Sequence, residues 1–543
     1  MKRAKMIAGT ALLISASAVF SAADEVADQT PGIGQVSFTT SCSPALEAPF
    51  NRAVAILHSF WFDEAVRSFR AITEADPDCA IAFWGLAMSY TKIAWGGPPS
   101  EVQFREGAEA ARRGLMAKQY SARERGFVEA IAAYYDGEGL SHSQRASAHE
   151  KRMAKLYESY GSDTEVALFY ALALLADLDP DDRSLSRELE AGRIAEHVFA
   201  LQPNHPGAAH YVIHSYDFPS LAGRALPAAR KYAEIAPGVA HALHMPSHIF
   251  TRLGLWDDAI HSNREALKAA EGAGDQAAAM HTMGYLIYAN LQSCQDEEAL
   301  RVLERARAVA RGEPDSLLVV GHLADIEARY ALERRAWREA ASLETSRFER
   351  FAFPEALVRA ARAIGTARTG DPGQAKIELE RLGTLASTLS GPSTGVGAAA
   401  SGGDTYRAGR IAIWRAVGAA WSDMSRGDPE AARKQMREAG ERADASIFIG
   451  SLLLGPDGLV HVDENAGDLL LETGRYEEAL AMYTRSLGIA RGRFNSLYGA
   501  GRAAELAGRD EIARRYYAQL VEQCHGATTH RPELANAREY LSK

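Results

Sequence analysis

Cysteine is scarce in this chain, and no two cysteines lie close together in the sequence. The 543 residues include four, Cys42, Cys79, Cys294 and Cys524. Without a Cys-x-x-Cys pair, the thiolate zinc sites and dithiol redox motifs built on such pairs are not indicated. Cys42 and Cys79 flank one predicted helical hairpin, so they are candidates for a disulfide in an oxidising compartment, or else are two buried free thiols. We assign no bond to Cys294 and Cys524, which are far apart in the sequence.

Basic blocks and long apolar stretches are also missing. The formal net charge is −10 and no block of lysine and arginine stands out, which argues against a nucleic acid as partner. Beyond residue 23 no stretch has the roughly 18 uncharged apolar residues that a helix needs to cross a membrane, so we expect no membrane span after signal cleavage. His-Glu-x-x-His, a phosphate-binding glycine loop and a nucleophile elbow are absent too, and whether the protein is an enzyme stays open.

The N-terminus has the composition of a secretory signal peptide. Lys2, Arg3 and Lys5 precede an apolar run, and small residues follow it at Ala22 and Ala23. We therefore expect residues 1–23 to be cleaved, an uncleaved anchor being the alternative, and a polar leader over 24–44. The expected location is the periplasm or the outside of the cell.

Helical periodicity runs through nearly all of the remaining chain. Ala, Leu, Arg and Glu dominate, and Gly or Asp-Pro marks the turns between paired helices. Three segments show a repeated pattern, with a small alanine about five residues after the turn: FWFDEAVRSFRAITEADP (60–77), CQDEEALRVLERARAVA (294–310) and GRYEEALAMYTRSL (474–487).

In these segments the chain resembles the tetratricopeptide repeat family, whose units are helix–turn–helix pairs of about 34 residues. The resemblance is clear over 46–95, 206–345 and 428–526, and weak over 100–200. It implies an all-α fold, a superhelical solenoid of antiparallel helix pairs whose first helices line a concave groove.

The repeats fall into two predicted arrays, 45–383 and 405–543. Residues 384–404 between them are rich in glycine and serine, as in SGPSTGVGAAASGGD. Such a composition is typical of a flexible linker, and the alternative is a long loop folded over the groove.

Histidine is concentrated between His205 and His281. His210/His214 and His244/His248 have the spacing His-x-x-x-His, which puts both rings on one helix face at a distance that suits a shared metal ion. The two pairs are offset by 34 residues, the period of the repeat. His205 itself is expected to cap a helix before Pro206.

Counting back from the small alanine of each second helix places the histidines on one stripe of the first helices. Its positions lie eighteen, fifteen and eleven residues before the alanine, and they share a helix face. The resemblance implies that this face looks into the groove. The stripe contains His210, His214, His241, His244, His248, His281, Tyr288, His322, Asp325, Arg329 and His461. Asp217 and Arg252 are further candidates for groove contacts.

We expect His210, His214, His244 and His248 to meet across two neighbouring helices, with His241 and His281 close to them. Imidazoles suit copper, zinc or iron, either as one ion with four ligands or as two ions with three each. Soft donors at Met245, Met280 and Met283 favour copper. A proton-linked or anion-binding site, or an incidental cluster, is the alternative.

The favoured function is an exported repeat protein with a multi-histidine transition-metal site in its concave groove. It is a metalloenzyme if one coordination position is open to solvent. The alternative is a non-catalytic scaffold of the cell envelope whose groove binds a peptide or a protein.

Overall fold

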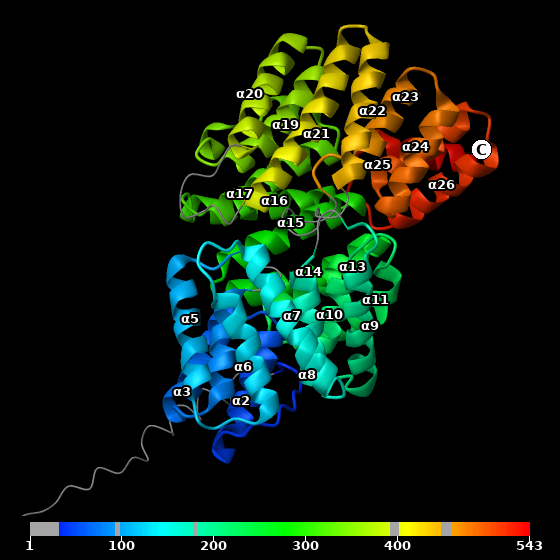
Figure 1. The fold of residues 1–543 in the computed structure, drawn as a ribbon. Coiled ribbons are helices and arrows are strands. Elements are labelled where there is room, and N and C mark those ends of the chain that lie inside the picture. The colour runs from blue at the N-terminus through cyan, green and yellow to red at the C-terminus, as the bar shows by residue number, and fades with distance from the viewer. Residues whose placement is uncertain (1–31, 93–97, 179–181, 391–400, 447–457) are drawn as a thin grey trace, which may run out of the picture.

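The computed structural model describes most of the chain after the leader (Figure 1). The described residues are 32–92, 98–178, 182–390, 401–446 and 458–543. The predicted signal peptide therefore lies outside the described residues. Within them, no helix is both long enough and apolar enough to cross a membrane.

The described chain is all-α, as the helical periodicity predicts, and it contains no strand. The helices of the first half are α2 (Glu47–His58), α3 (Phe62–Ala75), α4 (Ala80–Thr91), α5 (Glu101–Met116), α6 (Ala122–Tyr135), α7 (His142–Tyr160), α8 (Thr164–Ala176), α9 (Ser186–Leu201), α10 (Pro206–Tyr216), α11 (Ala222–Ile235), α12 (Ala240–His244), α13 (Pro246–Leu253) and α14 (Trp256–Gly272). A short 3₁₀ turn, η1 (Pro44–Leu46), precedes them.

The second half continues the same pattern. Its helices are α15 (Gln276–Gln292), α16 (Asp296–Gly312), α17 (Leu317–Glu333), α18 (Trp337–Ala341), α19 (Ala352–Arg368), α20 (Pro372–Ser390), α21 (Ser401–Ser425), α22 (Pro429–Ser446), α23 (Val462–Glu472), α24 (Tyr476–Ile489), α25 (Phe494–Leu506), α26 (Asp510–Gln523) and α27 (Pro532–Ser542), with η2 (Ser346–Phe348) before α19.

The helices stack as a solenoid of antiparallel pairs. Each helix packs on the next one, and the first helices of successive pairs pack on each other, as α15 does on α17 and α17 on α19. The alanines that mark the repeat, among them Ala65, Ala259 and Ala479, have no exposed surface, because two helix backbones approach each other there. Figure 1 shows the result as two groups of helices, blue to green below and green to red above.

The C-terminal helices return to the middle of the chain. Cys294 and Cys524 form a disulfide with a Cα–Cα distance of 5.3 Å, so the prediction of no bond between them is wrong. The Trp256 indole also donates a hydrogen bond to the Gly492 carbonyl at 3.2 Å. The curvature of the solenoid brings these residues together, and sequence separation gives no sign of that curvature.

The predicted bounds of the linker differ from the structure. Residues 384–390 belong to the last turns of α20 and 401–404 to the start of α21, so the expected linker is shorter at both ends; its middle, 391–400, lies outside the described residues. In the polar leader, Phe38 is fully buried against Phe50 and other rings, so this segment packs onto the first helices.

Candidate metal centre

Helix α10 carries two histidines that face the interior, and an N-cap hydrogen bond and a proline fix where this helix begins. His205 is the N-cap and its Nδ1 accepts a hydrogen bond from the Ala208 N–H at 3.3 Å, while Pro206 occupies the first turn. This confirms the predicted capping role of His205. The helix then buries His210 completely and leaves His214 7% exposed.

The histidines of the next repeat lie on a broken helix. Helix α12 ends at His244 and α13 begins at Pro246, which cannot donate to the preceding turn. His241 precedes His244 by three residues, and their side chains therefore differ by about 60° around the helix axis. As a result His241 reaches back to α10, whereas His244 and His248 face His281 on α15.

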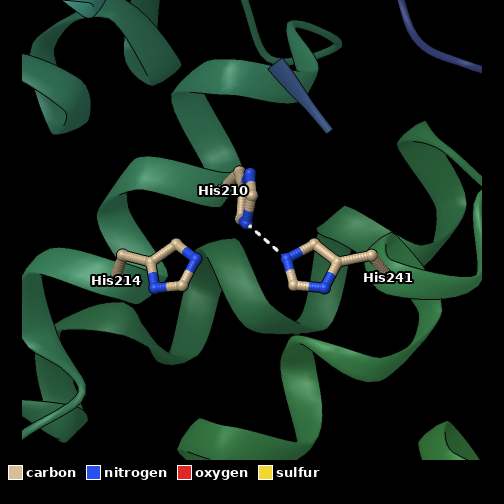
Figure 2. A group of neighbouring side chains, drawn as sticks. All are labelled: His210, His214 and His241. Atoms are coloured by element: carbon tan, nitrogen blue, oxygen red, sulfur yellow. Dashed lines mark hydrogen bonds between the residues drawn. The ribbon is translucent and has the colours of Figure 1, made fainter. Parts of the chain in front are cut away.

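The structure thus divides the six histidines into two groups of three, and His210, His214, His244 and His248 do not meet at one point. Figure 2 shows the first triad, in which His210 and His214 from α10 converge with His241. The Nε2 atoms of His210 and His241 are 3.1 Å apart. The ring centroids of His210 and His214 are 4.6 Å apart.

The second triad comprises His244, His248 and His281. The Nε2 atoms of His244 and His248 are 3.1 Å apart, and the His281 ring centroid lies 4.6 Å from that of His244. In each triad, one ligand nitrogen from every histidine lies within 4.8 Å of the other two. Each triad thus offers three imidazole ligands, as many as a metal ion has in known tris-histidine sites.

For three of the six rings, an oxygen acceptor fixes which nitrogen is protonated. His210 donates its Nδ1–H to the His58 carbonyl at 2.7 Å. His248 donates its Nδ1–H to the Asp217 carboxylate at 2.9 Å, and Arg252 donates to the other oxygen of that carboxylate at 2.9 Å. Such acceptors hold a metal-binding imidazole in the tautomer whose Nε2 carries a lone pair.

His244 is held in the same way by an amide whose orientation is fixed. The Asn263 Nδ2 donates to the Ala259 carbonyl at 2.8 Å, so its Oδ1 faces His244 and accepts the Nδ1–H at 2.7 Å. The Nε2 of His244 therefore carries a lone pair.

Burial keeps five of the six rings neutral. It lowers the pKa of His210 to about 3, and burial together with neighbouring histidines lowers the pKa of His214, His241, His244 and His281 well below the usual value. His248 of the second triad contributes to the lowered pKa of both His214 and His241. The two triads are therefore within electrostatic reach of each other.

A third group, His58, Glu165 and His205, has the residue types of a metal site but is already satisfied by hydrogen bonds. The Glu165 carboxylate accepts from His58 Nε2 at 2.9 Å and from His205 Nε2 at 2.8 Å. His58 Nδ1 accepts from the Tyr211 hydroxyl at 2.9 Å. Burial alone would raise the pKa of Glu165, but the two histidines hold it below the usual range. We interpret this group as the support that positions the His58 carbonyl for His210.

The other predicted contacts lie around the triads or farther along the groove. His322 packs on His281 with ring centroids 5.2 Å apart, and Asp325 pairs with Arg329 at 3.2 Å. Tyr288 accepts a hydrogen bond from Arg493 at 3.0 Å. Met245, Met280 and Met283 belong to the hydrophobic core. Cys42 and Cys79 are disulfide-bonded, with a Cα–Cα distance of 5.0 Å.

Sequence reasoning missed several residues of the site. Tyr285 packs on all three rings of the second triad, and its position four residues after His281 could have revealed it. Phe60 packs on all three rings of the first triad with its backbone at φ 55°. Glu165 and Asn263 carry no sequence signal for their roles.

Comparisons with known proteins give fold neighbours only. No family model matches the chain, and no match was found among curated proteins. A tetratricopeptide repeat protein from Parabacteroides merdae matches with a TM-score of 0.29 and 12% identity, over 56% of this chain and 99% of its own. Human IFIT1 bound to m7Gppp-AAAA matches with a TM-score of 0.34 and 12% identity, over 85% and 89% of the two chains. Yeast Tom70 has the same score and identity, over 91% and 94%. Likenesses this weak carry no inference about function, which rests on the residues of this chain.

Proposed function

We propose that this chain is an exported metalloprotein that holds one transition-metal ion in each histidine triad. The export part rests on the composition of residues 1–23, and the metal part rests on the two triads. The family resemblance supports only the helical fold and gives no information about metal binding.

The observation that carries the proposal is the contact between His244 and His248. Both rings donate their Nδ1–H elsewhere, to Asn263 and Asp217, so two Nε2 lone pairs face each other at 3.1 Å. Two acceptors at this distance repel unless a cation lies between them. The cation is either an additional proton or a metal ion.

Geometry and burial favour the metal ion. Zinc–nitrogen bonds of about 2.0–2.1 Å at tetrahedral angles put two ligand nitrogens about 3.3 Å apart, close to the observed separation. An additional proton shared by the two rings would place positive charge on His244, whose pKa burial lowers well below its usual value. The third imidazole, His281, also converges on the same point, which a shared proton does not require.

Three protein ligands leave one position of a tetrahedral ion open for water or substrate, the arrangement of catalytic rather than structural zinc sites. His241, His248 and His281 are each partly exposed, so both triads have a side from which a small molecule could approach. Copper, zinc and iron all accept three imidazoles, and a bound ion of this kind supplies Lewis-acid chemistry or, for copper and iron, redox chemistry.

Elemental analysis of the protein purified with its leader from an exporting host tests the proposal. We expect two transition-metal ions per chain in the wild type and one in His244→Ala/His248→Ala. His261→Ala, which removes an exposed histidine of α14, is the matched control and should retain two. A wild type that holds less than a tenth of an ion per chain after metal supplementation would contradict the proposal and leave the peptide-binding scaffold as the better hypothesis.

A further inference from the structure

The stripe that carries the second triad continues beyond it along two parallel first helices. On α15 it runs from His281 to Tyr288, and on α17 from His322 through Asp325 to Arg329. The two helices pack on each other, and His281 contacts His322 at the start of the stripe. Arg329 follows His322 by seven positions, a rise of about 10 Å along the helix axis.

Guanidinium groups gather at the far end of this stripe. Arg329 and Arg493 are 0% and 2% exposed. Their Cζ atoms lie 5.0 and 5.8 Å from the centroid of the same Tyr288 ring. Arg493 bonds Glu333 at 3.0 Å and Glu464 at 2.8 Å. Through Glu464 this cluster reaches the start of α23, where His461 is the N-cap.

A third guanidinium approaches the same segment from α21. Arg410 lies against Gly458, three residues before His461, so closely that a Cβ on Gly458 would come within 2.1 Å of its Nη2. In the described part of the chain Arg410 forms no ion pair. Burial lowers the pKa of His461 well below its usual value, and the charges of Arg493, Arg329, Arg410 and Arg252 lower it further, so these charges are within electrostatic reach of the ring.

Three buried nitrogens of this cluster make no hydrogen bond within the described part of the chain. Arg329 Nη1, Arg410 Nε and His461 Nε2 are buried atoms without a hydrogen-bond partner among the described residues. The carboxylates nearby are already engaged: Asp325 binds Arg329, and Glu333 and Glu464 bind Arg493. Glu333 also lies 3.9 Å from Arg329 Nη1, within ion-pair distance but too far for a hydrogen bond. Buried donors without partners are rare in folded proteins, because the lost hydration is not replaced.

We propose that this cluster, Arg329, Arg410 and His461 with Arg493 behind them, binds a small oxyanion, the carboxylate or phosphate group of a ligand. Among the described residues, Arg329 Nη1 and Arg410 Nε have no hydrogen-bond acceptor and Arg410 has no carboxylate partner. An anionic oxygen group would supply both, and guanidinium groups match its geometry. A ligand that is bound here and is about 10 Å long would reach the second triad with its other end. Only this statement about the second triad rests on the proposed metal function; the oxyanion site does not.

Calorimetric titration of the metal-free full chain with succinate, and separately with inorganic phosphate, tests the inference. We expect saturable one-site binding of at least one of the two, weakened at least tenfold in Arg410→Gln. Arg415→Gln, an exposed arginine of the same helix, should stay within twofold of the wild type. His461→Asn provides a second variant that should also weaken binding, in case Arg410→Gln perturbs folding.

Two outcomes would overturn the inference: the wild type shows no saturable binding of either anion, or Arg410→Gln and His461→Asn both bind like the wild type. The anion that binds more tightly, succinate or phosphate, indicates whether the natural ligand carries a carboxylate or a phosphate group. Metal content is measured on the same preparations before chelation. If the purified protein contains two metal ions but the metal-free protein binds no anion, only the oxyanion site is contradicted. If the purified protein contains no metal but binds the anion, only the metal function is contradicted.

Discussion

The two triads use the same residue type and differ in what surrounds them. In the first, His210 is held by the neutral carbonyl of His58, and the apolar Phe60 ring packs on all three imidazoles. In the second, His248 is held by the Asp217 carboxylate, and the Tyr285 phenol packs on all three. The first triad is therefore surrounded by a neutral carbonyl and an apolar ring, whereas the second has a carboxylate hydrogen-bonded to one of its histidines.

This difference predicts different affinities. A carboxylate that accepts the Nδ1–H raises the basicity of the imidazole and adds a negative charge near the ion. Burial would raise the pKa of Asp217, but Arg252 and His248 lower it, so the carboxylate is charged at neutral pH. We therefore expect the second triad to bind a divalent ion more tightly than the first.

The largest effect that we expect is a decrease in the free energy of unfolding of the metal-free protein at acidic pH. Both triads contribute to this decrease. A histidine whose folded pKa lies below about 6.5 favours folding above that pH, and this stability is lost as the pH falls toward the folded pKa, about 3 for His210. For each such histidine, the free energy of unfolding decreases by about 1 kcal/mol as the pH falls from 7.5 to 5.5. Urea unfolding in EDTA should therefore show a loss of several kcal/mol over this range.

A variant shows whether the triads cause this loss. His210→Gln, which removes one titrating ring of the first triad, should decrease the pH-dependent loss by about 1 kcal/mol and leave the rest. A free energy of unfolding that is flat between pH 7.5 and 5.5 would show that the rings are not buried in neutral form.

The next effect separates the triads. Asp217→Asn keeps the shape of the side chain and removes its charge, so we expect the affinity of the second triad for zinc to fall about 10- to 100-fold and that of the first to stay unchanged. Competition with a chelator of known affinity measures both sites. Asp258→Asn, on the exposed start of α14, is the control. Equal weakening of both sites would contradict the comparison between the triads.

Much of the fold could be predicted because it depends on local patterns. The alanines at repeat positions, such as Ala259 and Ala479, mark where helices pack, and both are fully buried. The return of α26 to α15 and α16 could not be predicted, since the Cys294–Cys524 bond depends on curvature summed over many repeats. The Gly/Ser composition of 384–404 overstated the linker because α20 continues to Ser390.

The stripe assigned all six histidines to the groove, but it could not assign them to their triads. The break between His244 and Pro246, and the rotation of about 60° that separates His241 from His244, decide which neighbour each ring meets. The groups that orient the rings come from elsewhere: the His58 carbonyl from α2 and Asn263 from α14. A backbone carbonyl has no sequence signature at all.

The smallest expected effect concerns the aromatic rings that distinguish the triads. The Tyr285 hydroxyl lies 3.3 Å from His248 Nδ1, beside the bond to Asp217. Tyr285→Phe should therefore weaken the second site by about threefold to tenfold, the worth of one hydrogen bond, and Phe60→Tyr should affect the first site alone. The d–d spectrum of the cobalt-substituted protein reports each change without relying on activity. If Tyr285→Phe leaves the spectrum and the affinity of the second site as they are, the phenol only fills space there, and Asp217 alone sets the triads apart.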